Sequence, residues 1–388
     1  MMAAFAAAQQ GHAVTLLEKN EKLGKKLYIT GKGRCNLTNA TDPEGLLAHV
    51  VGNPSFLYSA FYTFGSDDLM RFFETQGVPL KVERGRRVFP VSDKASDIIR
   101  AMEKALKAQG VQVLLHHEVL GIAKEEDGPV CGAETRQGFF PADAVIVATG
   151  GQSYPATGST GDGYRFAHAL GHSVTPLSPA LVPIILEDAW VPALAGLSLR
   201  NVALSAPPVF TGQGELLFTH NGLSGPVALT ASRYLAQAAS LAIDLKPALC
   251  PSTLDARLLR DFSASPNKLL ENVLPALLPR ALVPVILAQT ALAETPVNRV
   301  TKAQRAALGQ AIKNLPLTPV GTAGFREAVV TAGGVNVREL NPKTMASKKV
   351  AGLYFAGEVL DVDASTGGYN LQIAFSTGYL AGMGLVEK

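Results

Sequence analysis

The sequence predicts an α/β chain in which buried parallel strands alternate with loops and helices. Residues 352–371 read GLYFAGEVLDVDASTGGYNL, an apolar strand followed by an acidic, glycine-rich turn and a helix. Residues 144–151 read AVIVATGG, an uncharged strand that ends in two glycines. Residues 13–18 read AVTLLE, a short apolar strand that ends in an acid. Buried strands that lead through glycine turns into helices are typical of open parallel sheets.

The stretch at 352–371 has the features that a flavin dinucleotide needs. Gly357 leaves the backbone bare at the strand end, so a ligand can approach it closely. Glu358 or Asp361 can accept a hydrogen bond from a ribityl or ribose hydroxyl. The helix expected near Asn370 would present free N–H groups and a positive dipole end, which suit the negatively charged pyrimidine edge of a reduced flavin. An ordinary strand, loop and helix is the alternative.

A second glycine-rich loop follows the strand that ends at Ala148, Thr149 and Gly150. It reads QSYPATGSTGDGY and leads into a helical pattern. We expect Asp162 to cap that helix, and Gly161 beside it to keep the backbone uncovered. A loop without side chains lets a flat ring system lie close to the main chain.

The chain opens on an almost wholly apolar helical stretch, Met1–Gln10, before the strand that ends at Glu18. This is the second half of a nucleotide-binding βαβ unit, in which the terminal carboxylate binds the adenosine ribose hydroxyls. The first strand and its G-x-G-x-x-G turn do not occur in the sequence. We therefore expect a gap between the strands containing Ala13–Glu18 and Ala144–Ala148, and about 15–20 codons upstream that encode the missing unit.

Four segments together resemble bacterial flavoproteins related to aminoacetone oxidase and the bile-acid dehydro-reductases. They are LEKNEKLGKKLYITGKGRCNLTN, ATGGQSYPATGSTGDGY, THNGLSGP, and VTAGGVNVREL with the following residues to FSTG. The resemblance spans nearly the whole chain. It implies a non-covalent FAD-binding Rossmann domain of the glutathione-reductase type, here N-terminally truncated, with an inserted β-rich domain and a helical subdomain. The expected bounds are 1–183 and 321–388 for the FAD domain, 184–250 for the β-rich insert and 251–320 for the helical part.

The cofactor contacts that we expect lie at strand ends and in glycine turns. In TGKGRCN, Arg34 can hold a phosphate or a flavin carbonyl, and a surface arginine in a glycine turn is the alternative. Val119 lies where such folds offer backbone to the adenine. The full expected set is Glu18, Lys19, Arg34, Cys35, Asn36, Val119, Ala148, Thr149, Gly150, Gly161, Asp162, Gly357, Glu358, Asp361, Asn370 and Leu371.

Three residues are the expected catalytic groups. His220, in the glycine turn FTHNGLSGP of the insert, is the best acid–base candidate because its ordinary pKa lies near working pH; a structural histidine is the alternative. Tyr369 and Asn370 directly precede or begin the flavin-facing helix and could orient substrate, although packing is the simpler role. Catalysis by Cys35 is disfavoured because no second cysteine is close in sequence.

The expected function is that of an FAD-dependent oxidoreductase that passes a hydride through flavin N5 to or from a small organic substrate. The sequence leaves open whether oxygen or NAD(P)H is the second reactant. Two alternatives remain: a flavoprotein that binds or modifies RNA through the basic residues of the helical insert, and a truncated chain with impaired FAD binding. An ordinary solvated face explains those basic residues equally well.

Composition agrees with a soluble α/β enzyme, which we expect in the cytoplasm. The 388 residues carry 35 basic and 32 acidic side chains, and the formal charge of +3 is too small to indicate a nucleic-acid partner. The three cysteines have neither disulfide-framework nor zinc-site spacing, so no metal is expected. The longest apolar run, near Leu282–Ala288, is short and contains Pro284, so no membrane span is expected. The oligomeric state is open.

Overall fold

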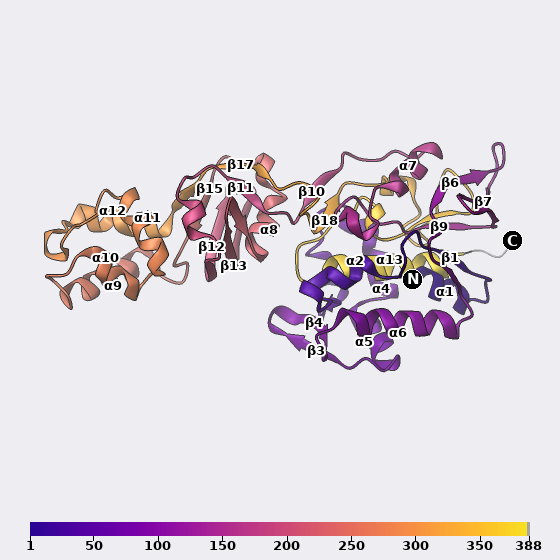
Figure 1. The fold of residues 1–388 in the computed structure, drawn as a ribbon, viewed down its shortest axis with the longest axis horizontal. Coiled ribbons are helices and arrows are strands. Elements are labelled where there is room, and N and C mark those ends of the chain that lie inside the picture. Colours follow the sequence, from indigo (N-terminus) through magenta and orange to yellow (C-terminus); the bar gives the residue numbers. More distant parts are fainter. Residues whose placement is uncertain (386–388) are drawn as a thin grey trace. The chain divides into compact units, whose positions relative to one another are not determined.

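The structure, a computed structural model, describes residues 1–385, and the chain divides into two compact units. The first unit comprises Met1–Pro179 and the segment from Ala328 onward, and the second comprises Ala180–Glu327. The sequence-based bounds of the insertion were 184 and 320. Each unit is described by itself below (Figure 1).

The parallel strands of the first unit form two separate pairs. Strand β1 (Thr15–Leu17) pairs with β5 (Gln112–Leu114), and β9 (Val145–Val147) pairs with β19 (Leu353–Phe355). Within residues 1–385, no strand is hydrogen-bonded to both pairs, so β1 and β9 belong to separate two-stranded sheets. The carboxyl ends of β1, β9 and β19 are the sites of the three loops that the sequence analysis singled out.

Two apolar helices pack closely in the first unit, α1 (Met2–Gln9) and α13 (Tyr369–Met383). Glycines on α13 make this approach possible. A Cβ atom at Gly382 would lie 2.4 Å from the carbonyl oxygen of Ala3, and one at Gly378 would lie 3.4 Å from its nitrogen. Residues on nearly every face of both helices are buried, which explains why neither helix has a polar face.

The amphipathic helix α6 (Ala95–Ala108) buries Ile98, Met102 and Leu106 against the same core as α1. The other helices of this unit are α2 (Lys25–Ile29), α3 (Pro43–Leu47), α4 (Tyr58–Thr63), α5 (Ser66–Thr75) and α7 (Asp162–Ala169). Its other strands are β2 (Thr38–Asn39), β3 (Leu80–Glu83), β4 (Arg87–Pro90), β6 (Val119–Lys124), β7 (Val130–Thr135), β8 (Gly138–Pro141), β10 (Ser178–Ala180) and β18 (Val330–Ala332).

The second unit is built on a seven-stranded antiparallel sheet in the order β16-β15-β12-β13-β14-β11-β17. Alternate side chains of its long central strands face the core, as in the burial of Leu199, Val202 and Leu204 on β12. The strands are β11 (Ile184–Leu186), β12 (Ser198–Ala206), β13 (Phe210–Thr219), β14 (Gly222–Ser224), β15 (Leu241–Asp244), β16 (Leu315–Leu317) and β17 (Pro319–Thr322). Helix α8 (Pro226–Ser232) packs on β13 and β12.

The helical part of the second unit contains α9 (Pro251–Ser263), α10 (Leu270–Val273), α11 (Val283–Gln289) and α12 (Lys302–Lys313). The expectation that this part runs to residue 320 is wrong at its end. Strand β16 pairs with β15, and β17 pairs with β11, so residues 315–322 belong to the sheet of the insert. Both strands contain proline and lie at the two edges of the sheet, where a missing N–H is tolerated. Among the described residues, no helix combines the length and apolarity that crossing a membrane requires.

Candidate functional site

The loops after β1 and β9 are joined by hydrogen bonds and an ion pair. Lys19 Nζ lies 2.6 Å from Asp162 Oδ2 and donates to Thr160 Oγ1 over 2.6 Å. The side-chain amide of Asn20 donates to the carbonyl oxygen of Thr157 over 3.1 Å. Burial opposes ionisation of Asp162, but the hydrogen bonds from Lys19 and Thr160 hold its pKa below the usual value. The ends of these two strands therefore face one polar region.

The turn after β19 is joined to the same region by Glu358. Its carboxylate accepts hydrogen bonds from Ser153 Oγ over 2.7 Å and from the backbone N–H of Thr331 over 2.9 Å. Lys26 Nζ lies 3.0 Å from Glu358 Oε2 and also donates to the carbonyl oxygen of Ser153. Lys26, Ser153, Thr331 and Glu358 are called the Glu358 cluster below. It ties helix α2 to β18 and to the loops after β9 and β19.

Glu18 follows β1, as expected for a ribose ligand. Its Oε1 accepts from both the backbone and the side-chain nitrogens of Asn20, over 2.8 and 2.7 Å. These bonds fix the direction of the carboxylate and engage one of its two oxygens. A carboxylate fixed in this way at a strand end suits the hydroxyl pair of a ribose.

The loop after β9 has an uncovered backbone and one unpaired polar atom. Ala148 is exposed, and Gly150 has a φ of +75°. Thr149 Oγ1 is buried and makes no hydrogen bond with the described residues. A Cβ atom at Gly163 would lie 2.2 Å from that oxygen, so a side chain at this position of α7 would displace the hydroxyl. An unpaired buried hydroxyl beside bare backbone fits a site for a polar ligand such as FAD.

Helix α7 begins differently from the expectation for Asp162. The N-cap is Gly161, with a φ of +83°, and Asp162 is the first residue of the helix. The prediction that Asp162 caps the helix is therefore wrong, because Lys19 takes its carboxylate instead.

The TGKGRCN segment sends its side chains in two directions. The side-chain amide of Asn36 is oriented so that its oxygen accepts a hydrogen bond from the backbone N–H of Gly368 over 3.0 Å. Asn36 therefore contacts the residue that precedes α13. Cys35 is fully buried, and burial raises the pKa of its thiol to about 12. Arg34 instead packs 4.1 Å from the Phe89 ring. Cys35 is thus a neutral core residue, and Arg34 points at the β3–β4 hairpin.

The start of α13 is held by its own loop and by a histidine. Asn370 accepts from the backbone N–H of Ala364 over 2.9 Å and donates to the carbonyl oxygen of the same residue over 2.8 Å. Tyr369 is buried and stacks on His49, with ring centroids 4.1 Å apart and planes inclined by 9°. Burial raises the pKa of the Tyr369 phenol. The amide of Asn370 is therefore a loop clamp, and Tyr369 stays protonated at neutral pH.

The remaining expected residues lie in varied surroundings. Val119 opens β6 opposite Thr135. The backbone of Asp361 accepts a hydrogen bond from the amide of Asn53 over 2.7 Å. Leu371 is half-buried beside the core that contains α1. His220 lies exposed in the turn between β13 and β14 of the second unit.

Sequence reasoning missed Lys26, Ser153, Thr331 and His49. Lys26 lies in LGKKLYITG, within a segment that carries the family resemblance, and this position could have marked it as a candidate site residue. Ser153 lies in the quoted ATGGQSY loop. Thr331 and His49 act through contacts between segments far apart in sequence, and no local pattern marks them.

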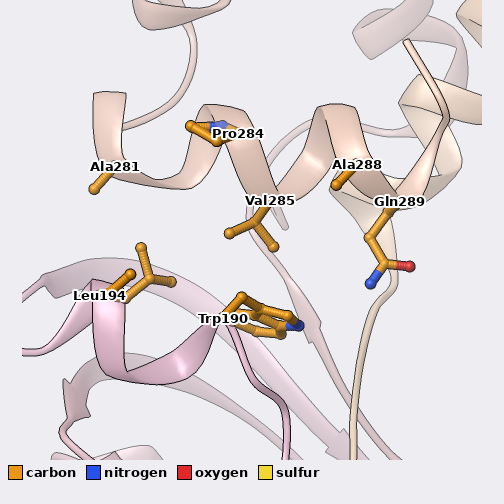
Figure 2. A pocket seen from close by; sticks show the side chains of 8 residues that line it. Trp190, Leu194, Ala281, Pro284, Val285, Ala288 and Gln289 are labelled. Carbon is orange, nitrogen blue, oxygen red and sulfur yellow. The ribbon is translucent and has the colours of Figure 1, made fainter. Parts of the chain in front are cut away.

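A separate cavity of about 480 Å³ lies within the second unit. Figure 2 shows Val285 of α11 directed toward Trp190 and Leu194. Its lining side chains are apolar apart from the Trp190 indole N–H and Gln289, and none of them is charged. A cavity without an acid or a base offers no proton transfer, so we do not assign catalysis to it.

Comparisons with known proteins place the chain in a family. Residues 1–384 match the family described as HI0933-like protein Rossmann domain. The chain is 34% identical to a 3-dehydro-bile acid delta(4,6)-reductase of Clostridium scindens, covering 100% of this chain and 97% of that protein. It is 32% identical to a ribosomal RNA dihydrouridine synthase of Haemophilus influenzae, covering 98% and 94%.

The fold is similar to that of solved flavoprotein oxidoreductases. A 3-ketosteroid-Δ4-(5α)-dehydrogenase from Rhodococcus jostii superposes with a TM-score of 0.52 at 15% identity, covering 99% of this chain and 93% of that one. The expected α/β fold with a Rossmann-type FAD-binding domain and the expected enzyme class, an FAD-dependent oxidoreductase, are both confirmed. The chain belongs to the family described as HI0933-like protein Rossmann domain.

Proposed function

We propose that the chain transfers a hydride between the N5 atom of FAD and a carbon–carbon double bond of a small organic substrate. The observation that carries this proposal is the joining of three strand ends by Lys19–Asp162 and by the Glu358 cluster. Ligands of open α/β sheets bind at the carboxyl ends of the strands. The two relatives are named as a delta(4,6)-reductase and a dihydrouridine synthase, and both names describe hydrogen added to a double bond.

The residues that would hold FAD follow from the site. Glu18 would bind the adenosine ribose through its second carboxylate oxygen. Thr149 would use its unpaired hydroxyl toward the cofactor, and the bare backbone near Gly150 and Gly357 would let the cofactor lie close. The N-terminus of α13, which follows Gly368, would stabilise negative charge on the flavin. These assignments rest on position and chemistry.

A hydride added to one carbon of a double bond requires a proton on the other. FAD supplies the hydride chemistry when it is bound. Tyr369 is the proton donor that we favour, because burial keeps its phenol protonated and the stack on His49 fixes its ring. His220 stays a second proposal for this role. We propose NAD(P)H as the electron donor that reduces the bound FAD.

The test replaces each candidate acid in turn. We expect Tyr369→Phe to bind FAD as the wild type does and to slow the oxidation of reduced FAD by substrate by about 10²–10⁴-fold. The measurement is anaerobic stopped-flow absorbance, with a 3-dehydro bile acid that has a carbon–carbon double bond conjugated to its ketone as the probe. His220→Ala is the parallel variant. If His220→Ala slows the step while Tyr369→Phe does not, the proton donor is His220.

RNA is a second candidate substrate. It is favoured by the relatives named as ribosomal RNA dihydrouridine synthases, which include one of Escherichia coli at 32% identity. It is also favoured by the positive charge of Arg86 near Tyr369, which is described in the next subsection. RNA retention that falls steeply with salt would support this candidate, and equal retention at low and high salt would exclude it.

A further inference from the structure

Positive side chains gather at the β3–β4 hairpin, and two of them, Arg34 from the TGKGRCN segment and Lys81 of β3, are neutralised by Glu83 and Asp93. Arg34 donates to Asp93 over 2.8 Å and also pairs with Glu83. Lys81 lies 2.7 Å from Asp93 and 3.5 Å from Glu83. These pairings use both acids and hold the pKa values of their carboxyls low. Any further positive charge on the hairpin is therefore uncompensated.

The turn of this hairpin, residues 84–87, supplies that further charge with the sequence RGRR. Arg87 has a structural role, since its Nε donates to the carbonyl oxygen of Arg84 over 3.1 Å. Arg84 and Arg86 are exposed, and among residues 1–385 neither guanidinium has an acidic or hydrogen-bonding partner. The turn thus presents two exposed guanidinium groups, two residues apart in sequence, that no acid among residues 1–385 neutralises.

The backbone of the turn is strained at one of the two free arginines. Arg86 has a φ of +58°, directly after Gly85 with a φ of +76°. A non-glycine residue in this region costs about 1–2 kcal/mol. The conformation is held from outside, because the backbone N–H of Ala40 donates to the carbonyl oxygen of Arg86 over 2.8 Å. A strained position that retains a long charged side chain is a reason to look for function there.

The turn is fastened to the start of α13. The side-chain amide of Asn39 donates to the carbonyl oxygen of Gly85 over 2.9 Å and to that of Gly367 over 3.2 Å. Gly367 lies two residues before Tyr369. The positive charge of Arg86 also reaches the phenol of Tyr369, where it acts to lower a pKa that burial raises. Arg86 and the proposed proton donor therefore share one neighbourhood.

We propose that Arg84 and Arg86 bind an anionic group of the substrate and so place its reacting double bond beside Tyr369. This inference rests on the proposed function. Guanidinium groups bind carboxylate and phosphate with the same donor geometry. The substrate class is therefore an unsaturated molecule that carries one of these two anions at a distance from the reacting carbons.

The experiment measures binding to the FAD-loaded full chain, with two probes. One is a 3-dehydro bile acid, compared with its methyl ester, which lacks the charge. The other is a fluorescent single-stranded RNA of mixed sequence, titrated at several salt concentrations. The variants are Arg84→Gln and Arg86→Gly, and the matched control is Arg100→Gln, an exposed arginine on α6. FAD affinity and the free energy of unfolding are measured for every variant.

We expect Arg86→Gly to weaken the binding of at least one anionic probe by about tenfold, the size typical of a lost hydrogen bond to a charge. The same variant should be at least as stable as the wild type, because glycine accepts a positive φ without strain. Arg100→Gln should bind both probes normally. A preference for the acid over its ester identifies a carboxylate, and a salt slope that decreases in Arg84→Gln identifies phosphate.

Unchanged binding of both probes in Arg84→Gln and Arg86→Gly would contradict the proposal, and so would a wild-type protein that binds neither anion. These outcomes differ from a failure of the proposed function, which would appear as a wild-type chain that binds no FAD.

Discussion

At the scale of single residues, Lys26 is the cation on which the Glu358 cluster depends. Its ammonium group and the Glu358 carboxylate are each about three-quarters or more buried. In Lys26→Met, a largely buried carboxylate keeps only neutral donors, so we expect the free energy of unfolding to fall by about 1–3 kcal/mol. Urea denaturation at pH 7 measures the change.

The neighbouring lysine is a matched control for this prediction. Lys25 pairs with the exposed Glu21, four residues earlier in the chain, over 3.2 Å. Exposed pairs of this kind contribute about 0.3–0.5 kcal/mol, so Lys25→Met should change stability little. Equal losses in the two variants would show that the Glu358 cluster adds nothing specific.

Single residues also show how far the sequence could lead. Glu18, Thr149 and Glu358 were singled out because each follows an apolar strand, and this position is readable from hydropathy. The engagement of the Glu358 carboxylate by Lys26 was not readable, because it depends on a contact between residues 332 positions apart.

At the scale of elements, the start of α13 depends on the glycine that precedes it. Gly368 has a φ of +100°, and a Cβ atom there would lie 2.4 Å from the carbonyl oxygen of Thr38. Gly368→Ala must therefore move the helix start away from β2. We expect a loss of more than about 2 kcal/mol in stability together with weaker FAD binding.

Gly110→Ala is the control that separates the cost of backbone strain from the cost of a steric clash at the new Cβ atom. Gly110 has a φ of +72°, but a Cβ atom there would meet nothing within 4 Å. That substitution should cost only the strain of about 1 kcal/mol and leave FAD affinity unchanged. The prediction for Gly368 is refuted if thermal denaturation and FAD titration give the same values for both variants.

Elements also show where sequence patterns fail. The alternation of strand and helix in the first unit was predictable because each buried strand is uncharged and ends in glycine or an acid. Strands β16 and β17 were assigned elsewhere because they are short, contain proline and follow a helical stretch. Their strand conformation comes from pairing with β15 and β11, which is tertiary information.

At the scale of the whole molecule, we expect the free energy of unfolding to fall at low pH because of a buried histidine–glutamate pair. His172 Nδ1 donates to Glu339 Oε2 over 3.0 Å. Burial by itself would raise the pKa of Glu339, but hydrogen bonds from Lys349 and Ser173 hold it at about 2, against a usual 4.5. Burial also lowers the pKa of His172.

Both shifts act in the same direction. The stability that Glu339 contributes is fully present above pH 4.5 and is lost as the pH falls toward 2. Below about pH 6.5 the unfolded chain takes up a proton at His172 more readily than the folded chain does, which favours unfolding. We expect stability to decline from pH 6.5 and to lose about 3 kcal/mol through Glu339 between pH 5 and 2. Urea midpoints across this range measure it, and Glu339→Gln should flatten the lower part. An identical pH dependence in that variant would disprove the assignment.

The central claim is that the carboxyl ends of β1, β9 and β19 bind FAD, and titration of the purified chain with FAD tests it most directly. The account predicts a saturable change in the flavin absorbance spectrum with one FAD per chain. It also predicts that Glu18→Ala weakens the binding by about 10–100-fold, through loss of a charge-assisted hydrogen bond to the ribose. A chain that binds no FAD, or an unchanged dissociation constant in Glu18→Ala, would contradict the account.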